Sequence, residues 1–229
     1  MSVAIITGCS RGLGLALADG LSKAGWQLVI DGRDPATLAD AAARLPGDVL
    51  ALPGDVTDPE HRKALVDTAC ELGRLDLLVN NAGVLGPSPQ PLLADYPLAA
   101  LREVYEVNVL APLALTQRAL PLLRSCGGAV VNISSDAAVE AYEGWGGYGS
   151  AKAAVEAIGR ILGAEEELVP VWTVDPGDLR TRMHQEAFPG EDISDRPLPE
   201  TVVPAFLRLL DDRPKSGRVK LAELAQEVH

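Results

Sequence analysis

Thr7-Gly8-Cys9-Ser10-Arg11-Gly12-Leu13-Gly14 follows a short apolar run that begins at Val3, and it leads into an amphipathic segment that reaches Lys23. The order predicts a buried strand, a glycine-rich turn and a helix. Glycines let a backbone come close to a pyrophosphate, and the first turn of a helix offers unpaired N–H groups to it. A P-loop does not fit, because no Lys-Ser/Thr pair follows the last glycine. The stretch therefore predicts a dinucleotide-binding turn, with contacts from Gly8, Ser10, Arg11, Gly12, Leu13 and Gly14.

Short apolar runs alternate with longer amphipathic segments as far as residue 176. The predicted strands are Val3–Thr7, Gln27–Asp31, Val49–Pro53, Leu75–Asn80, Gly128–Ser134 and Val171–Val174. The predicted helices are Gly12–Lys23, Pro35–Leu45, Pro59–Leu72, Leu98–Arg124 with a bend near Pro112, and Tyr148–Glu167. This alternation predicts an α/β fold, a Rossmann-like doubly wound parallel sheet with helices on both faces. The strands are continuously apolar, as strands buried on both faces are.

The pattern changes after Pro176. Residues Arg182–Pro199 are polar and contain Pro189-Gly190, which predicts a substrate flap at about 182–199. Thr201–Leu210 has helical spacing, and Ser216–Lys220 predicts one more strand, about seven in all. The chain shows no internal repeat and no low-complexity linker, so we expect residues 1–229 to form a single domain.

Composition excludes several classes of function. The formal net charge of −12 with no basic stripe argues against a nucleic-acid partner. No apolar stretch approaches the ~18 residues of a membrane span, and no signal peptide is recognisable, so we expect a cytoplasmic protein without a membrane partner. The three cysteines are scattered and the three histidines lack zinc spacing, which predicts neither disulfides nor a metal site.

The end of the second predicted strand bears on the choice of dinucleotide. A carboxylate there binds the ribose 2′-hydroxyl of NAD, whereas a nearby arginine accommodates the 2′-phosphate of NADP. Asp31 could be that acid, but Gly32 follows it, and side chains of a strand alternate in direction. Arg11 and Arg33 could instead converge on a phosphate. The alternative is that both arginines are solvated surface charges.

Tyr148 and Lys152 stand four positions apart at the start of a predicted helix, and therefore on one helical face. A nearby ammonium favours phenolate and lowers the pKa of a tyrosine, which would suit it to exchange a proton with a carbonyl or alcohol oxygen. Such a spacing also arises by accident as a surface pair. Ser135 ends a predicted strand thirteen positions earlier, where it could hold a substrate oxygen.

Two further polar features interrupt apolar surroundings. Asn80-Asn81-Ala82-Gly83 ends the fourth predicted strand with small and turn-forming residues, which suit a close approach of the backbone. Asn108 lies within an apolar helical stretch, where an asparagine is locally unfavourable. It is either a core amide whose hydrogen bonds are satisfied or a polar contact at the site.

Taken together, these residues resemble the shorter, roughly 250-residue branch of the short-chain dehydrogenase/reductase family. The resemblance rests on an ordered set along nearly the whole chain: Thr7-Gly8-x-x-x-Gly12-x-Gly14, Asp55-Val56, Asn80-Asn81-Ala82-Gly83, Asn108, Ser135, Tyr148-x-x-x-Lys152 and Pro176-Gly177. Single motifs of this set are weak, but the ordered combination is highly specific. The resemblance implies a sheet of order 3-2-1-4-5-6-7 and hydride transfer between a nicotinamide and a carbonyl or alcohol.

The same resemblance implies roles for individual residues. Tyr148 would be the general acid/base, and Lys152 would lower its pKa and bind the nicotinamide ribose. Ser135 would position the substrate oxygen, and Asn108 would hold a water that links Lys152 to a proton relay. The cofactor contacts implied beyond the glycine turn are Asp55 and Val56 at the adenine, Asn81, Ala82 and Gly83 at the adenosine, and Pro176, Gly177, Leu179 and Thr181 at the nicotinamide.

The resemblance also favours NADP(H) over NAD(H), because Gly32 stands where NAD-preferring members carry an acid and Arg11 and Arg33 match basic positions of NADP-preferring members. Family members form homodimers or homotetramers, and the unusual tail, Ala222–His229, bears on the contact through the last strand. Asp175 and Asp178 depart from the family pattern and place two carboxylates near the nicotinamide.

The predicted substrate is a small-molecule carbonyl or alcohol, of medium size and apolar or aromatic. The side chains that could line its site are Tyr142, Trp145, Met183, His184 and Phe188, although His184 is expected to face the solvent rather than to act in catalysis. The alternative function is a non-catalytic, NADP-binding redox sensor, which would have no need of the set Asn108, Ser135, Tyr148 and Lys152. A sugar-nucleotide epimerase or dehydratase fits poorly, because those chains are longer.

Overall fold

Seven parallel strands form a single sheet in the order β3-β2-β1-β4-β5-β6-β7, which confirms the predicted topology. The structure is a computed structural model that describes residues 1–226. The strands are β1 (Val3–Ile6), β2 (Gln27–Gly32), β3 (Val49–Pro53), β4 (Leu77–Asn80), β5 (Ala129–Ile133), β6 (Val171–Asp175) and β7 (Gly217–Lys220). Strand β1 lies in the middle, paired with β2 on one side and β4 on the other. Strands β2 and β3 are thus added on one side of β1 and the later strands on the other. In open α/β sheets, ligands bind at the point where the strand order reverses in this way.

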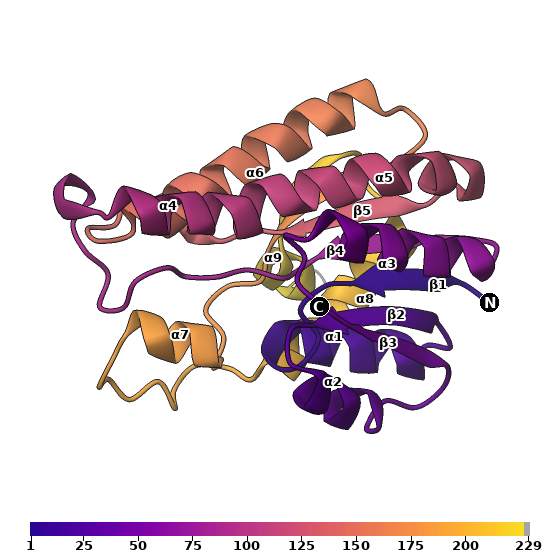
Figure 1. Cartoon of the computed structure of the whole chain (residues 1–229), viewed down its shortest axis with the longest axis horizontal. Helices are drawn as coiled ribbons and strands as arrows, with labels where there is room; N and C mark the ends of the chain where they lie inside the picture. Colours follow the sequence, from indigo (N-terminus) through magenta and orange to yellow (C-terminus); the bar gives the residue numbers. More distant parts are fainter. Residues whose placement is uncertain (227–229) are drawn as a thin grey trace.

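Helices cover both faces of this sheet. They are α1 (Gly12–Lys23), α2 (Pro35–Ala42), α3 (Pro59–Glu71), α4 (Leu98–Tyr105), α5 (Ala111–Cys126), α6 (Gly146–Glu165), α7 (Arg182–Ala187), α8 (Val203–Asp212) and α9 (Leu221–Gln226), with short 3-10 turns at Leu93–Asp95, Asp136–Ala138 and Pro199–Val202. Figure 1 shows α4, α5 and α6 together on one side of the sheet and α1 and α2 on the other. The predicted elements are all present, with ends that differ by a few residues.

Successive side chains of β1 contribute to apolar clusters on opposite faces of the sheet. Ala4 and Ile6 belong to the apolar cluster under α1 and α8, whereas Val3 and Ile5 belong to the cluster under α3 and α5. Since successive side chains of a strand point to opposite faces, a strand buried on both sides needs apolar residues at every position. This is the physical reason for the continuous apolar runs in the sequence.

The predicted helix Leu98–Arg124 is divided. A π-helical segment, Glu106–Leu110, joins α4 to α5, and the irregularity comes just before Pro112 rather than at it. Pro112 lies in the first turn of α5, where its missing N–H costs nothing. Single π-helical turns are frequent at functional sites, and this one contains Asn108.

The predicted flap has more regular structure than expected from its polarity. Thr181 caps α7 by accepting a hydrogen bond from the backbone N–H of His184, 3.1 Å away. Arg180 N–H donates to the carbonyl of Pro197 at 2.8 Å, which closes the segment into a loop that starts and ends at the sheet. Figure 1 shows α7 projecting to one side of the sheet, beyond the ends of the strands.

The last described residues form α9, whose Leu221 is buried against the core under α1 and α8. Of the unusual tail predicted from the sequence, residues 227–229 lie outside the described residues. Within residues 1–226, no helix has the length and apolar character needed to cross a bilayer.

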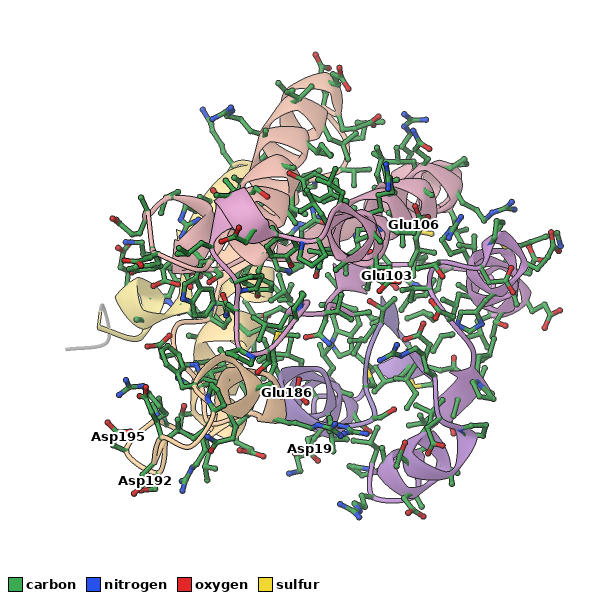
Figure 2. The ribbon with its side chains drawn as sticks, turned by 60° about the vertical axis from the view of Figure 1, so that its left-hand side comes forward. Asp19, Glu103, Glu106, Glu186, Asp192 and Asp195 are labelled. Carbon is green, nitrogen blue, oxygen red and sulfur yellow. The ribbon has the colours of Figure 1, made fainter. Side chains whose placement is uncertain are left out.

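Acidic side chains are distributed over several elements of the surface. Figure 2 shows Asp19 on α1, Glu103 and Glu106 on and after α4, and Glu186 on α7. Asp192 and Asp195 extend from the loop that follows α7. The net charge of −12 therefore comes from residues far apart in the chain.

Candidate functional site

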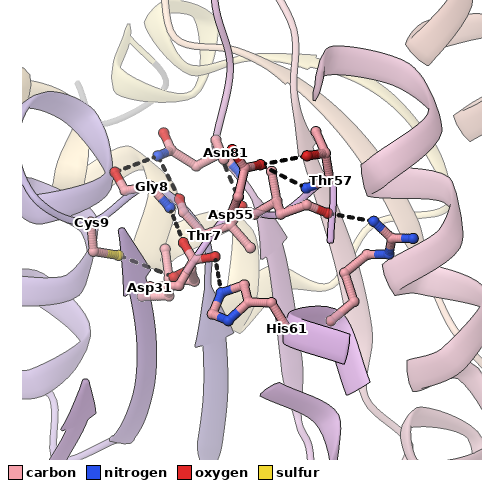
Figure 3. A network of polar contacts seen from close by, with 12 residues as sticks. Thr7, Gly8, Cys9, Asp31, Asp55, Thr57, His61 and Asn81 are labelled. Carbon is pink, nitrogen blue, oxygen red and sulfur yellow. Dashed lines mark hydrogen bonds and ion pairs between the residues drawn. The ribbon is translucent and has the colours of Figure 1, made fainter. Parts of the chain in front are cut away.

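The loops that follow β1 and β4 are held together by one hydroxyl. Thr7 Oγ1 accepts hydrogen bonds from the backbone N–H groups of Asn81 and Ala82, both at 3.0 Å. Asn81 Nδ2 donates in return to the carbonyl of Thr7 at 2.7 Å. These contacts link the predicted glycine turn to the predicted adenosine contacts at one edge of the sheet (Figure 3).

Glycine is required in this turn by geometry. Gly8 has φ +72°, a conformation that residues with a Cβ rarely adopt, and a Cβ there would lie 2.9 Å from Ala82 Cα. A Cβ on Gly14 would lie 2.4 Å from Asn81 Nδ2 and 2.5 Å from the carbonyl oxygen of Gly8. The two glycines thus allow α1, the turn and the β4 loop to pack together.

The first turn of α1 is suited to an anion. Arg11 is the N-cap residue of α1, but its side chain makes no capping hydrogen bond. The first backbone N–H groups of the helix therefore have no hydrogen bond to the N-cap side chain. A Cβ on Gly12 would meet only the side chain of Thr181, at 3.7 Å, so the backbone is open there. The residues present therefore fit the pyrophosphate of a dinucleotide, with Gly12, Leu13 and Gly14 offering backbone to it.

Asp31 is buried beneath the glycine turn rather than exposed at the corner of the site. Its Oδ1 accepts from Gly8 N at 2.6 Å, and its Oδ2 lies 3.1 Å from His61 Nε2 (Figure 3). The side chains of Asp31 and His61 are only 2% and 8% exposed. A carboxylate with both oxygens engaged inside the protein is not placed to bind a ribose, which decides between the two roles that the sequence left open for Asp31.

Gly32 and Ser10 fill the corner where an acid would otherwise stand. A Cβ on Gly32 would lie 2.1 Å from Ser10 Oγ, so the present packing leaves no room for a larger residue. Arg11 and Arg33 are exposed on either side of this corner. Within residues 1–226 neither guanidinium has a hydrogen bond or ion pair, although Arg11 lowers the pKa of Asp34 slightly, after the hydrogen bonds from Thr37.

The loop after β3 brings Asp55 and Val56 to the same edge. Asp55 Oδ1 accepts from both the N–H and the hydroxyl of Thr57 at 2.8 Å, and Arg62 donates to the carbonyl of Val56 at 2.6 Å. Burial alone would raise the pKa of Asp55, but the hydrogen bonds from Thr57 and the charge of Arg33 lower it. The loop is thereby fixed beside the glycine turn, as the predicted adenine contacts require.

Tyr148 and Lys152 lie on one face of α6, near the carboxyl end of β5. The ammonium of Lys152 is 5.5 Å from the centre of the Tyr148 ring and donates to the carbonyl of Ile133 at 2.7 Å. Ile133 is the last residue of β5, and Ser135 follows it two positions later. Lys152 therefore contacts both the ring of Tyr148 and the strand end that precedes Ser135, and the roles of these three residues stay predictions.

The expected effect of Lys152 on Tyr148 is not found. Burial, followed by the charges of Asp136 and Asp175, raises the pKa of Tyr148 well above its usual range. Burial also lowers the pKa of Lys152 to about 8, so the ammonium is protonated at neutral pH. The prediction of a lowered tyrosine pKa was wrong, because spacing on a helix shows neither the burial of a phenol nor the carboxylates that face it.

Asn108 has all of its side-chain hydrogen bonds within the protein. Its Oδ1 accepts from Val84 N at 3.2 Å, and its Nδ2 donates to the carbonyls of Val84 and Val104 at 2.8 and 2.9 Å. The amide thus ties the π-helical segment to the loop after Asn81-Ala82-Gly83. Of the two alternatives from the sequence, the geometry matches the satisfied amide, and its place in a proton relay stays a prediction.

Ser135 is hydrogen-bonded to its neighbour in the chain. Ser135 Oγ donates to Asp136 Oδ1 at 2.8 Å, and the other oxygen of Asp136 accepts from the hydroxyl of Tyr142 at 2.9 Å. Burial raises the pKa of Asp136, but the hydrogen bonds from Ser135, Tyr142 and the backbone outweigh this and lower it. Asp136 is therefore a charged residue beside the predicted reaction site.

Asp175, one of the two departures from the family pattern, has a cationic partner. Arg218 on β7 donates to Asp175 Oδ2 at 2.8 Å and to the carbonyl of Ser135 at 3.3 Å, and it pairs with Glu156 on α6. Burial nonetheless raises the pKa of Asp175, which also accepts from Gly177 N at 3.0 Å. Arg218 thus connects the ends of β5 and β6, where the Pro176-Gly177 turn begins.

Aromatic rings connect the flap to the start of α6. The ring of Trp145 lies 5.9 Å from that of Tyr148 and 5.9 Å from that of Phe188, centre to centre. His184 stacks on Phe188 at 4.9 Å, and its side chain is only 11% exposed. The expectation that His184 faces the solvent was wrong, because α7 turns this face of the flap toward Trp145. Thr181 and the buried Leu179 precede α7, at the place predicted for the nicotinamide.

Several residues at this edge were not found from the sequence. Asp136 could have been noticed because it adjoins Ser135, and Arg218 because it is a cation in the last strand of an acidic chain. His61 gave no signal, since its contact with Asp31 joins two distant segments.

Comparisons with known proteins agree with this geometry. The family model described as short chain dehydrogenase matches residues 2–192. The chain is 38% identical over 192 residues to the rhamnolipid biosynthesis 3-oxoacyl-(acyl-carrier-protein) reductase of Pseudomonas aeruginosa, covering 79% of this chain and 74% of that one. A short chain dehydrogenase from Shigella flexneri, solved in complex with NADP, superposes with a TM-score of 0.87 at 29% identity, over 96% of this chain and 95% of that one. An alcohol dehydrogenase from the archaeon Thermococcus sibiricus, complexed with 5-hydroxy-NADP, gives a TM-score of 0.85 at 26% identity, over 96% and 95%.

Proposed function

Because this chain belongs to the short-chain dehydrogenase/reductase family of NAD(P)-dependent oxidoreductases, we propose that it transfers a hydride between NADP(H) and a small carbonyl or alcohol, with Tyr148 as the general acid/base. The observation that carries the proposal is that Lys152 contacts both the ring of Tyr148 and the carbonyl of Ile133, the last residue of β5, with Ser135 two positions beyond it. They lie on the same edge as the glycine turn, which is where a dinucleotide would be bound.

Each of the three residues has a defined part in the proposed reaction. The nicotinamide, when bound, supplies or accepts the hydride. Tyr148 carries its proton at neutral pH and would donate it to the carbonyl oxygen, although burial and nearby carboxylates, which raise its pKa, oppose this donation. The charge of Lys152, 5.5 Å from the centre of the ring, would offset part of this opposition by attracting the phenolate that remains after donation. Ser135 offers a hydroxyl for the same substrate oxygen.

The preference for NADP(H) over NAD(H) is supported by the corner after β2. Asp31 is committed to Gly8 and His61, and Gly32 provides no side chain, so neither position offers a carboxylate to a ribose 2′-hydroxyl. Arg11 and Arg33 are exposed there, with no side chain of the described residues paired to them. Guanidinium groups in this position can make bidentate contacts with a 2′-phosphate.

A non-catalytic redox sensor is the alternative, and nothing favours it. A sensor needs the glycine turn alone. This chain also buries Lys152 beside Tyr148, and the desolvation of a charged lysine is unfavourable. Binding of the cofactor by the glycine turn does not require that burial.

Replacement of the tyrosine tests the proposal. Tyr148→Phe removes only the hydroxyl, and general acid/base help is worth roughly 10²–10⁴-fold, so turnover of ketones with NADPH should fall by about that factor. Absorbance of NADPH measures the rate, and titration of NADPH fluorescence should show nearly unchanged binding. Rates of Tyr148→Phe close to those of the unmodified enzyme would refute the role of Tyr148, and tight NADPH binding without turnover of a broad panel of ketones would favour the sensor.

A further inference from the structure

A carboxylate beside the reacting groups has no part in the proposed hydride transfer. Asp136 follows Ser135 in the chain, and its Oδ1 accepts the Ser135 hydroxyl at 2.8 Å. Its other oxygen accepts the hydroxyl of Tyr142 at 2.9 Å. The charge of Asp136 also reaches Tyr148, since it raises the pKa of that residue after burial. Asp136 therefore faces the place where Ser135 and Tyr148 would hold a substrate oxygen.

This carboxylate is not neutralised by a salt bridge. Within residues 1–226, no lysine, arginine or histidine forms an ion pair with Asp136. The charge of Asp136 acts on the pKa of Arg218, which burial lowers and this charge raises. The hydrogen bonds of the Arg218 guanidinium nevertheless go to Asp175 and to the carbonyl of Ser135. The hydrogen bonds that Asp136 receives come from the hydroxyls of Ser135 and Tyr142 and from the backbone N–H of Ala137. An ionised carboxylate has about four acceptor positions, so these three bonds leave room for one more donor.

The hydroxyl of Ser135 has only one proton, and Asp136 holds it in the present geometry. A substrate oxygen that binds Ser135 must compete for this proton. A substrate that brings its own donor can give that donor to Asp136 while its carbonyl oxygen takes the proton of Ser135. A donor on the neighbouring carbon is in the right place. Oxygens on neighbouring carbons are separated by about the length of a hydrogen bond, and Ser135 Oγ and Asp136 Oδ1 are separated by a similar distance, 2.8 Å.

We propose that Asp136 makes the site selective for carbonyl compounds, and the corresponding alcohols, that carry a hydrogen-bond donor on the carbon next to the reacting carbon. This proposal rests on the proposed function. The donor is a hydroxyl or an amino group, and both give the same chemistry at the carboxylate. The rings of Tyr142, Trp145 and Phe188 provide an apolar surface on the same side, which suits an aryl or alkyl group on the other side of the carbonyl. A carboxylate in place of the donor would be repelled by Asp136.

A matched set of ketones tests this selectivity. α-Hydroxyacetophenone and α-aminoacetophenone carry the donor, propiophenone replaces it by a methyl group of similar size, and benzoylformate carries a carboxylate in place of the CH₂ group and its donor. With the NADPH-loaded enzyme, kcat/KM should be roughly 10–100-fold higher for the donor-bearing ketones than for propiophenone, as expected for a hydrogen bond to a charged group. Benzoylformate should be the poorest substrate. The two donor-bearing compounds distinguish a hydroxyl from an amino group.

Two variants locate the effect. Asp136→Asn keeps an acceptor for Ser135 but removes the charge, so the ratio of kcat/KM between α-hydroxyacetophenone and propiophenone should fall toward one. Glu143→Gln removes another carboxylate from the same exposed loop, and it should retain the ratio of the unmodified enzyme. Equal NADPH binding by the two variants shows that both are folded.

Three results would overturn the inference. The first is turnover of propiophenone as fast as that of the donor-bearing ketones, and the second is a ratio that survives in Asp136→Asn; in both cases the proposed function stands. The third is failure to reduce any carbonyl compound in spite of tight NADPH binding, which overturns the proposed function and this inference with it.

Discussion

Replacement of Asp31 by alanine should destabilise the chain strongly, although the residue lies at the edge of a cofactor site. The substitution leaves Gly8 N–H without its 2.6 Å partner and His61 without its 3.1 Å partner. Both groups are inside the protein, since the Asp31 and His61 side chains are 2% and 8% exposed. A buried polar group without a partner costs about 1–3 kcal/mol, and the substitution leaves two such groups. We expect the free energy of unfolding to fall by about 2–6 kcal/mol.

Urea unfolding followed by circular dichroism measures this change, provided that the slope with urea stays constant. Asp31→Asn is the matched variant, because its amide oxygen can still accept from Gly8, whereas the charge is lost and an NH₂ group replaces the oxygen that faces His61; it should cost less than Asp31→Ala. Asp67→Ala is the surface control. Its carboxylate pairs with Lys63 at about half exposure, and exposed pairs contribute about 0–1 kcal/mol.

The same variants report on the cofactor turn. Gly8 loses the contact that fixes its N–H, so Asp31→Ala should also bind NADPH more weakly than Asp31→Asn. If Asp31→Ala unfolds with a loss no greater than that of Asp67→Ala, the buried network does not stabilise the fold and the reasoning is refuted.

Two further predictions concern charge at opposite ends of the site. Arg33→Ala should weaken NADPH binding about tenfold or more and NADH binding much less, because a charged hydrogen bond to a phosphate contributes about 1.5–3 kcal/mol; equal losses in fluorescence titrations of the two cofactors would exclude a contact with the 2′-phosphate. Burial lowers the pKa of Lys152 from 10.5 to about 8, so between these pH values the folded chain binds fewer protons than the unfolded chain, and its free energy of unfolding rises with pH. Relative to Lys152→Met, which lacks the titrating group, the unmodified chain should gain up to about 3 kcal/mol across that window in urea unfolding, and a constant difference would contradict a buried ammonium.

Much of the architecture could be predicted because local patterns dictate it. Strands such as β1 must be apolar at every position when helices cover both faces, and the glycine turn must leave space for Ala82 and Asn81. The bend near Pro112 was predicted, but the π-helical form of the segment before it was not. Asn108 lies in this segment and donates to the carbonyl of Val84, and no spacing within the helix records that bond.

The sequence by itself determined the order of the elements, the dinucleotide turn and the spacing that brings Tyr148 and Lys152 to one helical face, since each of these depends on residues close together in the chain. Only the tertiary structure decided the electrostatics of the site, that is, the partners of its carboxylates and the pKa of Tyr148. Asp31 meets His61 across 30 positions and Arg218 meets Asp175 across 43, and these contacts determine which carboxylates have partners inside the protein. The pKa of Tyr148 was raised rather than lowered for the same reason, because burial and the charges of Asp136 and Asp175 depend on how separate segments pack.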